Sequence, residues 1–390
     1  MYGHGRPLLK IISYLELIIL IPTLGLAGFL LQRIISPILL IRVGVLSSKY
    51  LGHFLYEADL YLADEENYVG SKKLDLITFQ PVVSNIYLAD KICSILKIKS
   101  PRLVYPIFLV NRVLSPNSRY LKRFAKDFKL NDSTRLGSLP PSKLAQMIIF
   151  ETSTELTDLD NEKSINNLFV LFLRTTSYRF LRKGALDSES SIYRDVSASD
   201  YNKLISNLKL FGIPLILGYD AEIVKRLNLK RIEVEKLNFG LFSQAKVSIT
   251  TDSGSALIPF FLRKPIVQTN ISMFGLIYGI PSNLILPKIY FDIEAGVKLT
   301  FRECLRRGIH EITSDHDYKK NRISVINLDD DTLGELTQEI VQISNQVWEA
   351  STLNMQLMAE LRSDFVKLYP ILQYQKFPNF WVEKNRWFFQ

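Results

Sequence analysis

The chain has 390 residues, which is more than one ordinary hydrophobic core requires and suits two domains of common size. Hydrophobic residues make up 47% of it and charged residues 22%, a balance that excludes a disordered or collagen-like protein. The formal net charge of +9 indicates anionic partners, namely phosphate-bearing substrates, acidic lipid headgroups or nucleic acid, and does not by itself choose among them.

Metal and cofactor signatures are sparse. Cys93 and Cys304 are far apart and form no Cys-x-x-Cys pair, which excludes a disulfide framework and a zinc signature and fits a reducing compartment. Four histidines are too few for a histidine-rich metal cluster. No motif interleaves the basic residues with aromatic ones, so we expect no nucleic-acid partner. We also expect neither a bound metal nor a cofactor.

The N-terminal segment is nearly all apolar from residue 11 to residue 31, and its one charged residue is Glu16. Its uncharged part, 17–31, is shorter than the roughly 20 residues that span a bilayer, and a longer span would have to accommodate the glutamate. A spanning or re-entrant helix, a surface-lying anchor and a buried helix all remain open. We predict contact with lipid at the cytoplasmic face of the inner membrane, as a peripheral or single-span protein.

The first half of the chain alternates between strand-like and helical patterns. We predict strands at 38–46, 74–79 and 103–105 and a helix at 85–96, which together favour a parallel sheet with crossover helices. The sequence Leu139-Pro140-Pro141-Ser142 breaks this pattern. We therefore divide the chain into a membrane-associated segment at 1–36, an acceptor-side domain at 37–160 and a second domain from residue 161.

A second alternating set of elements begins near residue 168. We predict strands at 169–173, 214–217, 247–250 and 266–269, and helices at 198–210, 237–245 and 256–262, with Ser199 and Asp200 capping the first helix. This order is the doubly wound pattern. We extend this donor-side domain to residue 332. Residues 333–390 carry amphipathic helical spacing, with a break near 351–354, and end in an aromatic tail, 377–389, expected to pack back across the domains or to touch membrane.

In an open parallel sheet, ligands bind outside the carboxyl ends of the strands. The residues that follow predicted strands of the second domain are therefore candidates for a binding site. They are Arg174, Gly218 with Asp220, Asp252-Ser253-Gly254-Ser255, and Asn270. The Asp252 to Ser255 segment joins a strand to a helix, and small residues there expose backbone N–H groups that suit phosphate. An ordinary capped helix start is the alternative, because Asp and Ser are favoured caps.

Two arginines are candidates for holding a diphosphate. A guanidinium binds phosphate oxygens bidentately, and Arg174 stands at a strand end. Arg194 stands just before a helix, between Tyr193, whose ring suits stacking on a base or sugar, and Asp195. The alternatives are a boundary arginine at the surface and a simple Arg194–Asp195 pair.

The first domain carries a candidate base. His53 follows the polar loop after the first predicted strand, where an imidazole suits proton abstraction from a hydroxyl, and Glu57 is an acidic alternative. Ser47, Lys49 and Gly52 are candidates for the acceptor side. A lone histidine is more often structural, so a packing role is the competing hypothesis.

Other catalytic signatures are missing from the sequence. There is no P-loop, no Gly-x-Gly-x-x-Gly after a strand, no Gly-x-Ser-x-Gly and no His-Glu-x-x-His. We recognise no Asp-x-Asp pair of the kind that a metal-dependent sugar transferase would use, and the place of the acidic run Asp329-Asp330-Asp331 before a long helix favours capping. These absences exclude several NTPase, dinucleotide, hydrolase and metalloprotease classes.

Several short motifs in fixed order resemble a bacterial family of glycosyltransferases of the GT-B type. They run from Arg42-Val43-Gly44 and Leu51-Gly52-His53-Phe54 through a Leu60-Tyr61-Leu62 strand, Arg174 with Ser177-Tyr178, Tyr193-Arg194-Asp195, Asp252-Ser253-Gly254, Arg263-Lys264-Pro265 and Thr269-Asn270 to Ile285-Leu286-Pro287-Lys288. The resemblance implies an α/β GT-B-like fold, in which two doubly wound Rossmann-type domains face a cleft behind an N-terminal apolar helix.

The same resemblance implies a function. A nucleotide-sugar donor would bind the C-terminal domain, a cell-envelope or lipid-linked glycan acceptor would bind the N-terminal domain, and no metal would be obligatory. Two positions depart from the family pattern, Thr175 where an aspartate is expected and Asp252 where a serine is expected. A nucleotide-sugar epimerase of the same fold and a non-catalytic membrane-bound homologue are the rival hypotheses.

Overall fold

The computed structural model describes residues 20–65, 72–80, 82–96, 98–122, 124, 139–157, 167–175, 189–217, 231–272, 284–309, 312, 314–365, 367 and 376–389. The chain divides into two compact units. Unit 1 comprises residues 1–129 and 142–148, and unit 2 comprises residues 130–141 and 149–390. The helix α7 (Lys143–Thr157) begins in the first unit and ends in the second.

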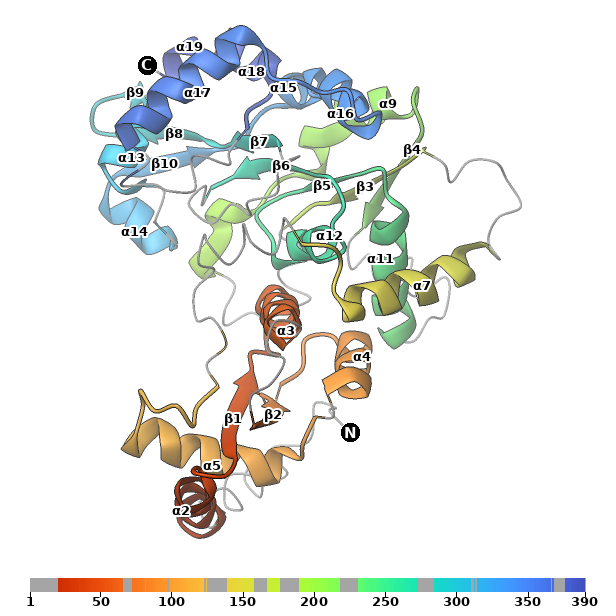
Figure 1. The fold of residues 1–390 in the computed structure, drawn as a ribbon. Coiled ribbons are helices and arrows are strands. Elements are labelled where there is room, and N and C mark those ends of the chain that lie inside the picture. Colours follow the sequence, from red (N-terminus) through yellow and green to blue (C-terminus); the bar gives the residue numbers. More distant parts are fainter. Residues whose placement is uncertain are drawn as a thin grey trace. The chain divides into compact units, whose positions relative to one another are not determined.

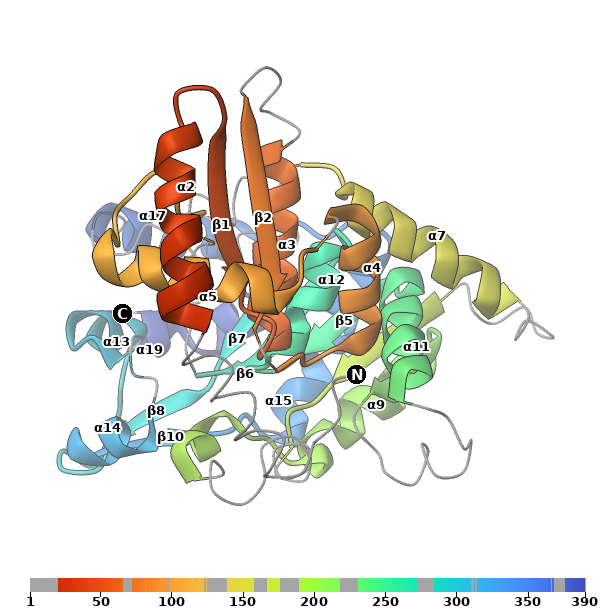
Figure 2. The ribbon, with the colours of Figure 1, turned by 90° about the horizontal axis from the view of Figure 1, so that it is seen from below.

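Unit 1 is built on two parallel strands, β1 (Leu40–Leu46) and β2 (Lys73–Phe79), paired from Leu40 opposite Lys73 to Leu46 opposite Phe79. The helix α3 (Leu51–Glu65) follows β1, and α4 (Ile86–Leu96) and α5 (Pro101–Leu114) follow β2. The predicted strands at 38–46 and 74–79 and the helix at 85–96 are confirmed. Figure 2 shows β1 and β2 side by side between α2 and α3.

Two predicted strands of unit 1 are wrong. Residues 103–105 lie in α5, whose buried side chains Val104, Ile107 and Val110 recur at helical spacing after a proline in the first turn. Residues 60–62 lie in α3, which is buried around much of its circumference, so its apolar run shows no clear helical period. The described part of unit 1 accordingly contains one two-stranded sheet, where a full doubly wound sheet was predicted.

The apolar N-terminal segment is described from residue 20 onward. A π-helical turn, η1 (Ile21–Gly25), continues into α2 (Leu26–Ile35), and both pack on α5. Gly25 and Gly28 make this close packing possible, since a Cβ at Gly28 would lie 2.5 Å from Cδ1 of Ile107. Within the described part of the chain, no helix has both the length and the apolar character required to cross a membrane. The predicted long apolar helix is thus not found there, and residues 11–19 lie outside the described residues.

Unit 2 contains a five-stranded parallel sheet of order β4-β3-β5-β6-β7. Its strands are β3 (Leu168–Phe172), β4 (Ile213–Leu217), β5 (Val247–Thr250), β6 (Ile266–Ile271) and β7 (Leu284–Pro287). The chain passes from β3 to β4 on one side and returns to β5 on the other, so the winding direction switches between β3 and β5. The doubly wound prediction is confirmed for this unit.

Helices cover both faces of this sheet (Figure 1). Among them are α9 (Asn202–Leu208), α11 (Arg231–Gln244) and α12 (Leu257–Phe261), and the unit also contains the short turns η4 (Glu189–Arg194), η5 (Ala198–Tyr201) and η6 (Gly254–Ala256). The cap of η5 is Ser197, whose hydroxyl accepts from Ser199 N while Asp200 completes a capping box. The predicted cap at Ser199 was therefore displaced by two residues.

A second, antiparallel sheet was not predicted. It has the order β10-β8-β9 and is formed by β8 (Ile289–Asp292), β9 (Val297–Lys298) and β10 (Ile323–Ile326), with α13 (Phe301–Arg306) and α14 (Asp315–Lys320) between β9 and β10. Its strands are only two to four residues long, too short for an alternating pattern to show in the sequence.

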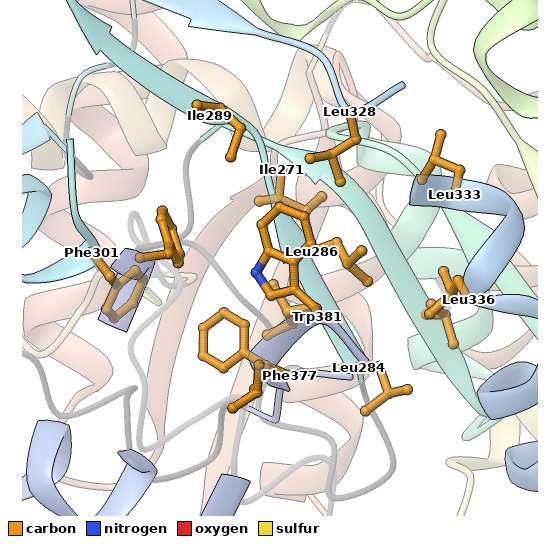
Figure 3. Packing of buried hydrophobic residues seen from close by; sticks show 14 of the residues in the cluster. Ile271, Leu284, Leu286, Ile289, Phe301, Leu328, Leu333, Leu336, Phe377 and Trp381 are labelled. Carbon is orange, nitrogen blue, oxygen red and sulfur yellow. The ribbon is translucent and has the colours of Figure 1, made fainter. Parts of the chain in front are cut away.

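The C-terminal helices close the core of unit 2. They are α15 (Asp330–Glu335), α16 (Thr337–Ser344), α17 (Thr352–Phe365), α18 (Asn379–Lys384) and α19 (Arg386–Phe389). Asp329 caps α15 by accepting from Thr332 N at 2.8 Å, so the acidic run has its predicted capping role. Figure 3 shows Phe377 and Trp381 packed among Ile271 and Leu286, which places the aromatic tail in the core of unit 2.

Candidate functional site

The switch point of the unit 2 sheet brings two predicted site segments together. Arg174 follows β3 by two residues, and Thr251 and Asp252 follow β5 directly. The backbone N–H of Arg174 donates to Oγ1 of Thr251 at 2.8 Å, which ties the two strand ends to each other. A doubly wound sheet opens a crevice at this position, because the connections leave its two central strands in opposite directions.

Two guanidinium groups converge on a single carbonyl oxygen at this point. Arg194 donates to the main-chain oxygen of Asp252 through Nε at 3.1 Å and Nη2 at 2.8 Å, and Nη1 of Arg174 lies 3.5 Å from the same oxygen. Arg174 is buried and also donates from Nε to Asp195 Oδ1 at 3.2 Å. Arg194 is more accessible, with its side chain 22% exposed. The carboxyl-end rule had placed Arg174 at this site, and Arg194 was a candidate from its position before a helix and from the motif order.

The carboxylate of Asp252 is fixed in place. Its Oδ2 accepts from the backbone N–H of Ser272 at 3.3 Å and from the Ser272 hydroxyl, while Oδ1 lies 3.4 Å from Nη2 of Arg194. Burial alone would raise the pKa of Asp252, but the charges of Arg194 and Arg174 and the hydrogen bond from Ser272 outweigh it and hold the pKa below its usual value. Asp252 is therefore an anion at neutral pH and orients the loop to which both arginines bind.

The pKa of Arg174 reflects the crowding of positive charge. Burial lowers it most, the nearby Arg194 lowers it further, and Asp195 and Asp252 oppose both effects. Two neighbouring guanidiniums that destabilise each other's charge favour the binding of an anion, which relieves the repulsion.

Lys288 is a site residue that the list of candidates omitted. It follows β7 directly, is 1% exposed, and donates from Nζ to the carbonyl oxygens of Tyr193 at 2.7 Å and Asp195 at 2.9 Å. It thereby fixes the segment that carries Arg194. The signal was present in the sequence, since Lys288 ends a recognised motif and stands at the carboxyl end of an apolar run.

Burial lowers the pKa of Lys288 to about 8, against the opposing charges of Asp252 and Asp195. The folded protein therefore binds fewer protons than the unfolded chain between pH 8 and the ordinary lysine pKa of 10.5. We expect the stability of the wild type relative to Lys288→Met to rise across this window by on the order of 3 kcal/mol, measured by urea unfolding. Lys209→Met changes an exposed lysine of the same unit, and its free energy of unfolding should depend on pH as that of the wild type does. If the free energies of unfolding of the wild type and Lys288→Met changed in parallel between pH 8 and 10.5, the lowered pKa of Lys288 would be contradicted.

Other predicted donor residues take part in the fold around this site. The ring of Tyr193 is buried against Tyr318, at 4.8 Å between centroids. Asn270 adopts a left-handed φ of 52°, donates from Nδ2 to Tyr201 OH at 3.1 Å and accepts from Leu328 N at 2.7 Å. Ser253 is buried beside Asp252, and Gly254 begins η6.

Several predicted residues cannot be placed. Ser177, Tyr178, Gly218 and Asp220 lie outside the described residues, and the side chain of Ser255 is likewise not described. Their assignment to the donor site stays a prediction.

In unit 1 the candidate base stands at the carboxyl end of β1. The loop from Ser47 leads into α3, and His53 lies in its first turn, partly exposed, with its ring 6.1 Å from that of Tyr50. Lys49 is exposed and its backbone N–H donates to Gln80 Oε1 at 3.3 Å, while Gly52 is buried. The residues after β2 thus brace the loop that carries the predicted acceptor-side residues.

Glu57 stands one helical turn after His53 and is buried. Its Oε2 accepts from the backbone N–H of Ser47 at 2.7 Å and so closes the loop between β1 and α3. Burial raises the pKa of Glu57 to about 7, with the Ser47 hydrogen bond opposing it. A carboxyl group with this pKa suits proton transfer near neutral pH, although its burial limits direct contact with a substrate.

The raised pKa of Glu57 predicts a pH-dependent effect of Glu57→Gln. The folded protein holds the Glu57 proton more tightly than the unfolded chain, so ionised Glu57 opposes folding fully above pH 7 and the effect disappears below the ordinary pKa of 4.5. A glutamine still accepts from Ser47 N. We expect the variant to be more stable than the wild type at pH 8 by on the order of 3 kcal/mol and equal to it at pH 4 in urea unfolding. Asp90→Asn, an exposed acid, is the control, and a pH-independent difference for Glu57→Gln would refute the interpretation.

Among the residues that the structure describes, no group of three or more His, Cys, Asp or Glu side chains is arranged to hold a metal ion.

Comparisons with known proteins give weak similarities. No protein-family model matches the sequence. No curated protein matches it. Among solved structures, the chain is similar to the ADP-heptose LPS heptosyltransferase II of E. coli, at 12% identity and a TM-score of 0.30 over 58% of this chain and 84% of that one. It is also similar to a glycosyl transferase of family 9 from Veillonella parvula, at 11% identity and a TM-score of 0.35 over 63% and 85%.

A third structure is an E. coli heptosyltransferase with ADP-2-deoxy-2-fluoro heptose, at 12% identity and a TM-score of 0.31 over 63% of this chain and 92% of that one. With identities and TM-scores this low, these similarities decide neither the fold nor the function of the chain. The doubly wound sheet of unit 2 and the geometry at its switch point come from the chain's own structure.

Proposed function

We propose that the chain is a glycosyltransferase that takes a nucleotide-sugar donor at the β3/β5 switch point of unit 2. The observation that carries the proposal is the convergence of Arg174 and Arg194 on the carbonyl oxygen of Asp252. Two guanidiniums placed at the ligand-binding edge of a doubly wound sheet suit a diphosphate. The ordered motifs in the sequence support the same class of enzyme.

The chemistry follows from the charge that develops in the reaction. When the bond between the sugar and the diphosphate breaks, negative charge accumulates on the leaving phosphate oxygens. Arg174 and Arg194 would stabilise it, while Lys288 holds the backbone that carries Arg194. Cationic side chains thus take the part that a divalent ion plays in other transferases, and turnover is expected to be insensitive to EDTA.

Acceptor activation belongs to unit 1 in this proposal. His53, at the end of β1, would take the proton of the acceptor hydroxyl, with Glu57 as the second candidate. The acceptor would be a cell-envelope or lipid-linked glycan. We place the enzyme at the cytoplasmic face of the inner membrane, a location that the apolar run 11–31 supports.

A panel assay tests the proposal against its rivals. The purified full chain is incubated with UDP-, GDP-, ADP- and CMP-sugars, with and without a membrane lipid extract. Release of the nucleotide only when the extract is present supports the transferase. Conversion of one nucleotide sugar into another without release would identify an epimerase, and saturable binding without turnover a non-catalytic homologue; either result overturns the proposal.

A further inference from the structure

One face of α2 carries a stripe of exposed aliphatic side chains. Leu26, Leu30 and Ile34 recur every four residues and therefore lie on one side of α2, and Ile38 follows in the turn after the helix. Ile34 and Ile38 are each 74% exposed, and Leu31 beside them is also exposed. A run of large exposed apolar residues on one face of a helix is characteristic of an interaction surface.

The packing of α2 explains why this stripe faces outward. Gly25 and Gly28 seat η1 and α2 closely against Pro106, Val110 and Ile107 of α5. Gln32, on the same inner side, is buried and accepts at Oε1 from Nδ2 of Asn111 at 2.7 Å. Figures 1 and 2 show α5 crossing α2.

Exposed apolar side chains also end α5. At the C-terminal end of that helix, Val113 is 76% exposed and Leu114 is also exposed. Asn111, in the same turn, lies 3.5 Å from Nη1 of Arg33, which brings this end of α5 to the C-terminal half of α2. We call Leu26, Leu30, Leu31, Ile34, Ile38, Val113 and Leu114 together the apolar patch.

Basic residues lie beside the C-terminal part of the patch. Arg33 belongs to α2 itself, Nη2 of Arg119 lies 3.3 Å from Ser36 Oγ at the end of α2, and Arg112 precedes Val113 in α5. Residues 20–38 and 98–122 contain no aspartate or glutamate. The strand that follows α2 pairs at its first residue with Lys73. A binding partner that meets both the apolar patch and these basic residues must therefore be apolar and negatively charged.

Arg33, Arg119 and Tyr120 form a cluster at the C-terminal end of α2. The guanidinium of Arg33 lies over the rings of Phe29 at 3.3 Å and Tyr120 at 4.7 Å, and its Nη2 donates to Ser115 Oγ at 3.1 Å. Arg119 lies 5.4 Å from the Tyr120 ring. Side chains with an apolar body and a polar tip are those that concentrate at the boundary between headgroups and acyl chains.

We infer that the apolar patch is a docking surface for a bilayer with anionic headgroups, with α2 lying in the interface and the basic residues contacting the lipid phosphates. Aliphatic residues on one helix face beside Arg33, Arg112 and Arg119 match such a surface better than they match a protein. The inference stands on unit 1 alone and is independent of the proposed transferase chemistry.

Vesicle flotation with the full chain tests this surface. The probes are phosphatidylcholine vesicles with and without about a third of phosphatidylglycerol, at low and high salt. We expect binding only to the anionic vesicles, weakened by salt, and at least about tenfold weaker partitioning for Leu30→Asn with Ile34→Asn, since each side chain loses its apolar contact with lipid. Arg112→Gln with Arg119→Gln should weaken binding to anionic vesicles several-fold.

Matched variants of unit 2 serve as controls. Leu210→Asn with Val347→Asn removes two exposed aliphatic side chains, and Lys319→Gln with Lys320→Gln removes two exposed charges. Both should bind as the wild type does.

The inference is overturned if the Leu30 and Ile34 variant floats like the wild type, or if the wild type binds neutral and anionic vesicles equally. Loss of self-association in that variant, seen by light scattering without vesicles, would identify a protein interface instead. Nucleotide binding should be unchanged in every variant, which separates this test from that of the proposed function.

Discussion

Replacing Arg174 and Arg194 together by alanine is expected to lower the affinity of the chain for nucleoside diphosphates by about 10²- to 10⁴-fold. Each charge-assisted hydrogen bond to a phosphate contributes about 1.5–3 kcal/mol, and a factor of ten corresponds to about 1.4 kcal/mol. The two guanidiniums lie at one oxygen, that of Asp252, so a diphosphate at this point contacts both. Isothermal titration with UDP, GDP and ADP measures the loss.

The control must separate lost binding from lost folding. Arg174 is buried beside Asp195, and removal of one partner from a buried ion pair is itself destabilising. Arg194→Ala alone changes the more exposed group and should retain the fold, with a loss of about tenfold or more. Arg307→Ala with Arg322→Ala removes two exposed arginines of the same unit and should bind normally. A folded double variant at Arg174 and Arg194 with wild-type affinity would show that the donor site lies elsewhere.

Replacing His53 by alanine is expected to reduce turnover by about 10²- to 10⁴-fold, the usual contribution of a positioned general base, without changing donor affinity. His53 belongs to unit 1 and the donor residues belong to unit 2. His53→Ala should therefore lower kcat, whereas the double variant at Arg174 and Arg194 should weaken nucleotide binding. Steady-state release of nucleoside diphosphate in the presence of acceptor measures kcat, and added imidazole should restore part of it.

His316→Ala, an exposed histidine of unit 2, is the matched control. Normal turnover in His53→Ala would remove this residue as the base. If Glu57→Gln were inactive in the same assay, the proton would be assigned to Glu57, whose pKa of about 7 also suits the role.

The elements of unit 2 were largely predictable because each sheet strand is a mainly apolar run flanked by polar residues, and β3, β5, β6 and β7 are buried along their whole length. The strand at 247–250 matches β5 residue for residue. The strand order was not readable from the sequence, since β3 pairs with β4, where Leu168 lies opposite Ile213, and also with β5, where Phe169 lies opposite Val247. The position of the switch point could therefore not be predicted from the sequence. The same holds for the proximity of Arg174 and Asp252, which depends on it.

Unit 1 shows where local pattern misleads. The sequence around Leu103 to Tyr105 is as apolar as a short strand, but it belongs to a helix whose buried face continues to Asn111. Strands and helices can be distinguished by the length of the apolar segment, but this requires a window longer than three residues. The longer segment favours the helix. The hydrogen bond from Asn111 to Gln32 joins this helix to α2. The two residues are far apart in the sequence, so a local sequence pattern cannot predict it.

In the site, the residues that would meet the ligand were easier to predict than those that position them. Arg174, Arg194 and Asp252 follow from strand ends and motif order. Ser272 and Lys288 act through Asp252 and through the backbone of Tyr193, so their roles depend on contacts that only the folded chain defines. Lys288 follows an apolar run like the others, and the same rule could have identified it.

Hydrogen–deuterium exchange of the full chain, with and without saturating UDP, GDP or ADP, tests the placement of the donor site most directly. Binding at the β3/β5 switch point predicts that exchange slows in η4 and in the segment from Thr251 to Gly254, which carry Arg194 and Asp252. Protection confined to other segments, under conditions in which a nucleotide demonstrably binds, would contradict that placement.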